Sequence, residues 1–347
     1  MAWGSARVPA GDPGAVCPAN APLRSYEAVL FSQPIPYGPA NVDLDGVVYA
    51  LADEEAAIRA GTLPVRPLVL RTNVGECLEV GLTNKLAQSA SLHAGELTFD
   101  PQGSYGAAIG FNTDSTVAPN ARRVYRFYAD QDVGITLFYN LANPTTAARG
   151  AFGAIVVEPA GSIYRNPLDG TTARAGIVAD IIPPQGSFRE YVGLLSDEDD
   201  VIGQNQMPYP TVVQGFTGLN YVSEAFADRL GVNADPALVF ASPVHGDPAN
   251  LLQAHLGDAV RLRVGKPWGT QGQVFGIEGH RWPLEPNMAG SNLIASKSFR
   301  SGEAFDMPLH DGAGGQAGAP GDYFFGDMRA PFQEAGGWGM LLSLIHI

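Results

Sequence analysis

Residues 134–159, GITLFYNLANPTTAARGAFGAIVVEP, decide the fold, because they contain two strands joined by a turn. The first segment, GITLFYNL, is apolar and rich in residues that favour strands, and the last, GAFGAIVVEP, is a near-continuous apolar run. Between them lies NPTT at 143–146, a typical turn sequence. A related strand–loop–strand pattern closes the chain at 321–325 and 337–342. Two copies of this pattern predict two domains of one kind.

The composition is typical of a protein built from short strands. The 347 residues suffice for about two domains. Only 16% of residues are charged, and Gly (42) and Pro (27) are frequent, which favours strands joined by turns over helices. The formal net charge of −14 argues against nucleic acid and anionic membrane surfaces as partners. No run of about 18 apolar residues occurs, so we predict no membrane span.

Further elements follow from the local pattern. Strands are predicted at 25–31, 47–51, 68–71, 77–83, 122–129 and 188–195, and a helix at 53–61. Residues 160–184 are rich in Gly, Pro, Asn and Thr, as expected of a segment between domains. The acidic run 197–200 lacks the spacing of a calcium loop and is interpreted as a solvated loop.

The sequence also contains a repeat on the scale of a domain. Residues 252–264 resemble 70–82: in both, a strand reaches Gly-Asp or Gly-Glu, turns, and returns as a second strand. Each copy continues for about 80 residues to its closing strand. We therefore predict two tandem Greek-key β-sandwiches.

Three segments in each copy of the repeat together resemble the sequence pattern of a known protein family. They are 70–84, 91–93 and 150–159 in the first copy, and 274–282, 320–325 and 337–340 in the second. This pattern resembles the cupredoxin domains of multicopper oxidases, in particular large bacterial members related to manganese oxidases and to ceruloplasmin. The resemblance implies an all-β fold of two tandem cupredoxin-like sandwiches. It also implies copper as cofactor, and the oxidation of metal ions or phenols by O2.

The expected domain boundaries follow from this pattern. They are an irregular N-terminal arm at 1–22, a first cupredoxin-like domain at 23–160, a linker at 161–187, a second cupredoxin-like domain at 188–342 and a non-native tail at 343–347.

The copper ligands of the family are largely missing. A blue-copper centre requires two imidazoles and a thiolate. The family's His-Cys-His run would fall at 137–143 and at 324–330, and neither segment contains Cys or His. The family's upstream copper-binding histidines would fall near Gln273, Gly276 and Glu278. The chain has six histidines in total, none in a His-x-His pair, so neither a type 1 nor a trinuclear copper centre can be assembled.

Two histidines remain as candidate metal ligands. His93 keeps one position of the family's Ser-x-His-x-His-Gly motif. It is either a single ligand completed by another domain or chain, or a retained histidine hydrogen-bonded at a strand end. His280 corresponds to the last histidine of its motif, generally not a ligand, and is a candidate for lining a site between domains. Neither histidine forms a complete site.

Cys17 and Cys77 leave two interpretations open. A disulfide would tie the N-terminal arm to the sheet, and closing a loop of about 60 residues would contribute about 4 kcal/mol. The alternative is two unrelated thiols. Two cysteines this far apart form neither a thiolate zinc site nor a CxxC motif.

Two functions fit these observations. In the first, the chain is a scaffold in a multicopper oxidase whose copper centres lie elsewhere in a longer chain, and the isolated chain is inactive. The alternative is a copper-free cupredoxin tandem that serves as a binding or structural module. We expect an extracytoplasmic or secreted protein, with further cupredoxin domains of the same longer chain or additional copies of this chain as partners. The missing leader and the abrupt end at 343–347 lead us to expect a fragment.

Overall fold

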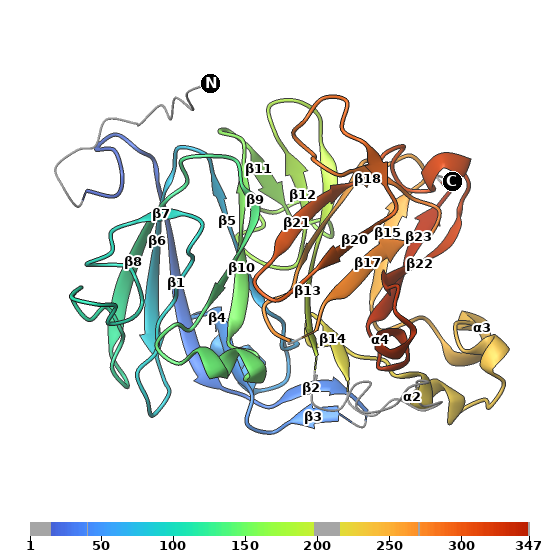
Figure 1. Ribbon diagram of the computed structural model, residues 1–347, viewed down its shortest axis with the longest axis horizontal. Coiled ribbons are helices and arrows are strands. Elements are labelled where there is room, and N and C mark those ends of the chain that lie inside the picture. Colours follow the sequence, from blue (N-terminus) through green and yellow to red (C-terminus); the bar gives the residue numbers. More distant parts are fainter. Residues whose placement is uncertain (1–14, 40, 198–215, 270, 346–347) are drawn as a thin grey trace.

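The computed structural model describes residues 15–39, 41–197, 216–269 and 271–345. Two β-sandwiches lie side by side, the N-terminal one in blue to green and the C-terminal one in yellow-green to red (Figure 1). None of the helices in these ranges is long and apolar enough to cross a bilayer. Of the acidic run 197–200, only Asp197 lies within the described residues, at the buried end of a strand.

The first sandwich has one five-stranded and one three-stranded sheet. The larger sheet has the order β4-β1-β6-β8-β7, with β1 (Leu23–Ser32), β4 (Val47–Leu51), β6 (Cys77–Asn84), β7 (Thr98–Phe99) and β8 (Arg122–Tyr128). The smaller has the order β5-β10-β9, with β5 (Leu68–Asn73), β9 (Gly134–Tyr139) and β10 (Phe152–Glu158). A hairpin of β2 (Ile35–Gly38) and β3 (Asn41–Asp43), the helix α1 (Glu55–Arg59) and the 3-10 turn η1 (Pro144–Arg149) complete it.

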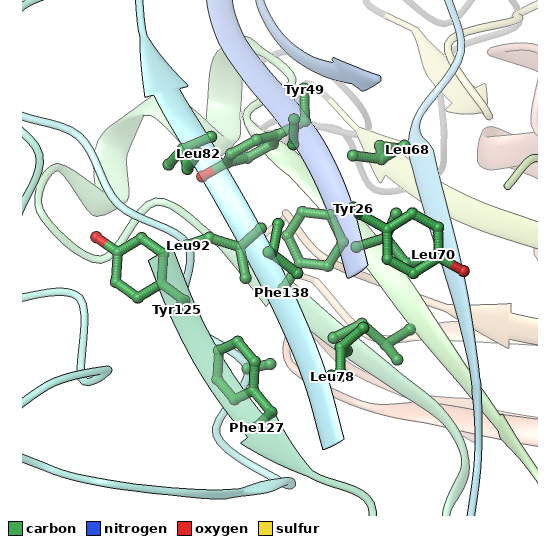
Figure 2. Close-up of a cluster of buried hydrophobic side chains, with 14 of the residues drawn as sticks. Tyr26, Tyr49, Leu68, Leu70, Leu78, Leu82, Leu92, Tyr125, Phe127 and Phe138 are labelled. Carbon is green, nitrogen blue, oxygen red and sulfur yellow. The ribbon is translucent and has the colours of Figure 1, made fainter. Parts of the chain in front are cut away.

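The core of this sandwich is made by alternating residues that the two sheets turn toward each other. Tyr49, Leu78 and Phe127 come from the larger sheet, and Leu70 and Phe138 from the smaller one (Figure 2). All five are buried. Each buried side chain of this size stabilises the fold by about 1.5–3 kcal/mol relative to its exposed state, so the core needs no metal to hold it.

The second sandwich repeats this plan with more strands. One sheet has the order β11-β12-β13-β16-β21, with β14 also paired to β13, and comprises β11 (Ile163–Arg165), β12 (Val178–Ile182), β13 (Phe188–Asp197), β14 (Thr217–Leu219), β16 (Val260–Gly265) and β21 (Ala304–Pro308). The other has the order β15-β23-β22-β17-β20, with β15 (Leu251–His255), β17 (Gln273–Ile277), β20 (Ser296–Phe299), β22 (Gly321–Asp327) and β23 (Trp338–Leu344). Short elements join them: α2 (Phe226–Leu230), η2 (Pro236–Leu238), α3 (Ser242–His245), β18 (Trp282–Pro283), β19 (Leu293–Ile294), η3 (Gly315–Ala317) and α4 (Ala330–Glu334).

The strand order confirms the repeat and two cupredoxin-like sandwiches. Parallel pairs β1/β6 and β5/β10 in the first sandwich correspond to β13/β16 and β15/β23 in the second. The predicted strand–turn–strand segments form, but their two strands do not pair with each other. β5 and β6 belong to opposite sheets, and so do β15 and β16. The turns at Gly75 (φ +86°) and Gly257 (φ +83°) carry the chain between sheets, in a backbone conformation that favours glycine.

Parts of the expected linker and of the expected tail form strands. Residues 161–187 contain β11 and β12, and β12 pairs with β13, so this segment belongs to the second sandwich. Its apolar residues alternate in burial, with Ala179 and Ile181 fully buried, although loops rich in Gly and Pro surround them. At the other end, β23 continues to Leu344, and Ser343 pairs with Ala254 of β15.

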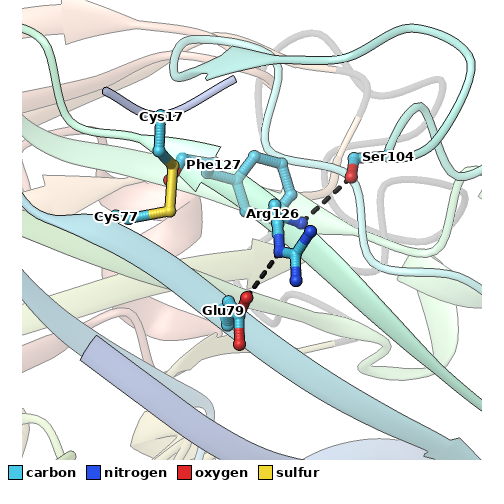
Figure 3. Close-up of a disulfide and its surroundings, with 6 residues drawn as sticks. All are labelled: Cys17, Cys77, Glu79, Ser104, Arg126 and Phe127. Carbon is cyan, nitrogen blue, oxygen red and sulfur yellow. Dashed lines mark hydrogen bonds and ion pairs between the residues drawn. A yellow bond between two sulfur atoms is a disulfide. The ribbon is translucent and has the colours of Figure 1, made fainter. Parts of the chain in front are cut away.

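A disulfide joins Cys17 to Cys77, the first residue of β6 (Figure 3). Their Cα atoms lie 5.7 Å apart, and 60 residues separate them in the sequence. In the chain-entropy model, closing such a loop stabilises the folded chain by about 4 kcal/mol. The N-terminal segment is therefore fastened to the sheet at the point where β1 begins to pair with β6.

The face between the two sandwiches contains a buried network of charges. Arg71 and Glu158 come from the first sandwich, and Glu190, Arg263 and Asp306 from the second. Arg71 pairs with Glu190, and Arg263 pairs with Glu158, with Glu190 (2.6 Å) and with Asp306 (2.6 Å). Because buried charges are costly without a partner, separating the two sandwiches would leave these charges unpaired.

Candidate copper-ligand positions

The first ligand region is the set Ser91, His93, Asn140 and Ala142, which lies where the family's paired histidines would stand. The backbones of His93 and Tyr139 are hydrogen-bonded to each other at 3.0 and 3.2 Å, which brings the loop after β6 against the end of β9. The buried Asn140 Oδ1 accepts the Ser91 N–H at 2.9 Å. The Ser91 hydroxyl in turn accepts the Ala142 N–H at 3.0 Å. Hydrogen bonds between neutral groups thus close the positions that copper ligands would take.

His93 lies in an aromatic environment inside this region. Its Nδ1 is 2.7 Å from the carbonyl oxygen of Tyr105, which can only accept, so Nδ1 carries the proton and Nε2 holds the lone pair. The ring stacks on Tyr105 with 5.2 Å between centroids and meets the edges of Phe99 and Tyr139. Burial lowers the pKa of His93, so the imidazole is neutral at about pH 7.

The second ligand region is the set Asp197, Lys266, Gln273 and Asp327, all buried. Gln273, at the expected place of a type 1 histidine, donates from Nε2 to Asp197 Oδ2 at 2.9 Å. The ammonium of Lys266 pairs with the same carboxylate. The sequence predicted a solvated loop at Asp197, whereas the residue is buried at the end of β13. Nothing in the sequence points to Lys266, since only the fold brings the ends of β13, β16 and β17 together.

Asp327 occupies the place in the second sandwich that Asn140 occupies in the first. In the first sandwich Tyr139 of β9 pairs with Phe152, the first residue of β10, and in the second Gly326 of β22 pairs with Trp338, the first residue of β23. Asn140 and Asp327 are the residues that directly follow Tyr139 and Gly326. Burial raises the pKa of Asp327 to about 6, although its Oδ1 accepts the Arg329 N–H at 2.8 Å. Both sandwiches therefore carry a buried amide or carboxyl group at this position.

His280 is buried at the end of β17, outside both ligand regions. Its Nδ1 donates to the carbonyl of Glu278 at 2.8 Å, and its ring meets Tyr323 edge to face at 4.7 Å. Burial lowers the pKa of His280, and Nε2 is buried with no hydrogen-bond partner among the described residues. Nearby, Gly276 offers no side-chain ligand and Glu278 is exposed.

Copper, the cofactor that the fold implies, does not fit the residues described. Both cysteines of the chain are in the disulfide, so no thiolate remains for a blue-copper centre. His93 and His280 lie in different sandwiches, and within the described ranges no three His, Cys, Asp or Glu side chains are grouped so that they could hold a metal ion. In the second region, the Lys266 ammonium would repel a cation.

Comparisons with known proteins agree with the fold. Residues 52–162 match the family model described as multicopper oxidase. No curated protein matches. A solved multicopper oxidase is 18% identical, with 92% of this chain and 89% of that one covered and a TM-score of 0.60.

Two further solved structures resemble the chain in fold. The blue copper oxidase from Nitrosomonas europaea is 14% identical, with 92% of this chain and 86% of that one covered and a TM-score of 0.59. The laccase from Botrytis aclada is 15% identical, with 93% of this chain and 53% of the laccase covered and a TM-score of 0.59. At these identities the likeness concerns the fold. Most of the first sandwich thus matches the multicopper oxidase model, and the described chain as a whole has the fold of these copper enzymes.

Proposed function

We propose that the two sandwiches are copper-free scaffold domains of a multicopper-oxidase-type protein, whose copper centres lie in other domains of a longer chain. The observation that carries this proposal is the second ligand region, where a buried ion pair and an amide take the place of the ligands. In the whole protein, copper would oxidise a metal ion or a phenol with O2, and these domains would hold the copper-bearing ones in place.

Physical chemistry supports a copper-free role for both regions. Copper centres of this type need imidazole and thiolate ligands. In the first region Ser91 and Asn140 are hydrogen-bonded to each other instead, and in the second the Asp197 carboxylate binds Lys266 and Gln273. The apolar cores and the disulfide stabilise the sandwiches without a metal. Loss of the ligands is therefore compatible with a retained fold.

We also propose that the protein works outside the cytoplasm, with further cupredoxin domains of the longer chain or other copies of this chain as partners. A disulfide persists in oxidising compartments and is rare in the cytosol, and the Cys17–Cys77 bond supports this location. A second candidate function is a copper-free binding module. A cavity in the second sandwich favours it, because the cavity is lined by Arg66, which has no carboxylate partner among the described residues.

Elemental analysis of the full chain, purified after growth with added copper, tests the proposal. We expect substoichiometric copper, no visible absorption from a copper–thiolate bond, and no oxidation of phenols or Mn(II). Stoichiometric, tightly bound copper would overturn it. Sequencing the gene locus separates the two candidate functions. Further domains with His-Cys-His motifs in the same reading frame support the scaffold, and a reading frame without them supports the module.

A further inference from the structure

The second sandwich encloses a cavity of about 200 Å³ between its two sheets. Its apolar walls are aliphatic and aromatic side chains, namely Leu219, Leu252, Leu262, Val264, Phe275 and Phe325, and Tyr191, Asn220 and Asn250 also line it. An apolar cavity of about 150 Å³ already suffices to hold a benzene molecule. The space therefore suits an apolar group about the size of a phenyl ring or a short alkyl chain.

A glycine, Gly193, lines the cavity from the inner face of β13. Tyr191 and Leu195 turn their side chains into the core, and Gly193 between them has none to offer. A Cβ atom at Gly193 would lie 2.9 Å from Leu219 Cδ1, so even a methyl group would push the Leu219 side chain aside. Glycine inside a strand weakens it, and such a position often marks the close approach of a ligand or of another segment.

Arg66 of the first sandwich lies at this cavity with donors to spare. Within the part of the chain that the structure describes, its guanidinium makes one hydrogen bond, from Nη1 to the Val65 carbonyl at 2.8 Å. Burial lowers the pKa of Arg66, and no carboxylate among the described residues offsets this effect. By contrast, Arg174 and Arg189, which line the larger groove next to the cavity, are each paired with an aspartate.

We propose that the second sandwich binds a small amphiphilic monocarboxylate, with its apolar body between the sheets and its carboxylate on Arg66. A guanidinium matches the geometry of a carboxylate through two parallel hydrogen bonds, and the half-buried setting strengthens such a pair. The apolar walls hold the rest of the molecule, because they offer it no other polar partner of this strength. Such a ligand would bridge the two sandwiches, since Arg66 precedes β5 of the first domain.

Titration calorimetry on the full chain, with benzoate and hexanoate as probes, tests this proposal. We expect both to bind, and the neutral analogues benzyl alcohol and hexanol to bind at least about tenfold more weakly, because a charge-assisted pair contributes about 1.5–3 kcal/mol. Arg66→Gln should weaken benzoate by a similar factor. The matched control Arg174→Gln removes a nearby arginine that is already paired, and should leave the affinity unchanged.

A second variant tests the apolar half of the site. Gly193→Val places methyl groups in the cavity, and should abolish binding while circular dichroism shows a folded chain. If this variant does not fold, Arg66→Gln still decides the question. Absence of binding by the wild-type chain at millimolar probe would overturn the proposal. So would equal affinity for benzoate and benzyl alcohol, or unchanged affinity in Arg66→Gln. None of these outcomes depends on copper, so the proposed scaffold function stands or fails separately.

Discussion

The two ligand regions occupy equivalent places in a repeated fold, yet they are built from different chemistry. In the first sandwich, Ser91 and Asn140 satisfy each other as neutral groups. In the second, Lys266 and Asp197 form a fully buried ion pair beside Asp327, whose carboxyl group has a raised pKa. The polar groups at these equivalent places are thus held once without charge and once with it.

This difference teaches what each region can tolerate. A neutral hydrogen bond stabilises the fold by about 1 kcal/mol net. Removing one partner leaves a single buried polar group without a hydrogen bond, which destabilises the fold by about 1–3 kcal/mol. A buried ion pair contributes little net stability, but removing one partner leaves a buried charge, which is far more costly. We therefore expect the second region to be the sensitive one, and the titration of a carboxyl group to matter only there.

Lys266→Met should have the largest effect. The change removes the ammonium from the buried Asp197 carboxylate and should lower the free energy of unfolding by about 3–5 kcal/mol in urea titrations. The double variant with Asp197→Leu should recover most of the loss, because both charges are then gone. Lys85→Met, at an exposed pair with Glu55, is the matched control and should cost less than about 1 kcal/mol. If Lys266→Met lowered the free energy of unfolding by no more than Lys85→Met does, the Lys266–Asp197 pair would not be buried in solution.

Asp327→Asn should change the pH dependence of stability. The carboxyl pKa is raised from 3.8 to about 6 in the folded state, so ionisation opposes folding. The free-energy cost of ionising Asp327 is absent at a pH below the unfolded-state pKa of 3.8. It grows as the pH rises from that pKa to the folded-state pKa, and it is complete above about pH 6. As the pH rises from about 4 to 7, the free energy of unfolding of the variant should therefore increase, relative to that of the wild type, by up to about 3 kcal/mol. A shift of one pKa unit corresponds to about 1.4 kcal/mol.

The measurement is the difference in unfolding free energy between the two chains at each pH. Asparagine keeps the oxygen that accepts the Arg329 N–H, so the variant removes only the titrating group. A difference that stays constant across this range would mean that Asp327 titrates at its ordinary value.

The sequence predicted the fold better than the ligand regions, for physical reasons. Alternating apolar residues and the repeated closing strands β9/β10 and β22/β23 are local patterns, and the structure has these strands as predicted. β12 was missed because its short apolar run is surrounded by loops rich in Gly and Pro. The pairing of strands across two sheets was also hidden, since a turn alone does not tell whether the chain returns in the same sheet.

The site depended on long-range contacts that no motif encodes. Lys266 and Asp197 are 69 residues apart, and nothing in their local sequence links them. The sequence has neither Cys nor His at 137–143 and 324–330, where the family's copper ligands would fall. It could name His93 and His280 as the retained histidines, but the carbonyl that holds each ring is visible only in the structure.

Asn140→Ala should have the smallest of the three effects and should complete the comparison. The change leaves the buried Ser91 N–H without its acceptor, so the free energy of unfolding should fall by about 1–3 kcal/mol. Because no charge is involved, this loss should be the same at about pH 4 and pH 7, unlike the effect of Asp327→Asn. Asn292→Ala, at an exposed asparagine, is the control and should stay within about 0.5 kcal/mol of the wild type. A loss in Asn140→Ala that equals that of Lys266→Met, or that varies with pH, would show that the first region is coupled to a charge, and the contrast between the two regions would then fail.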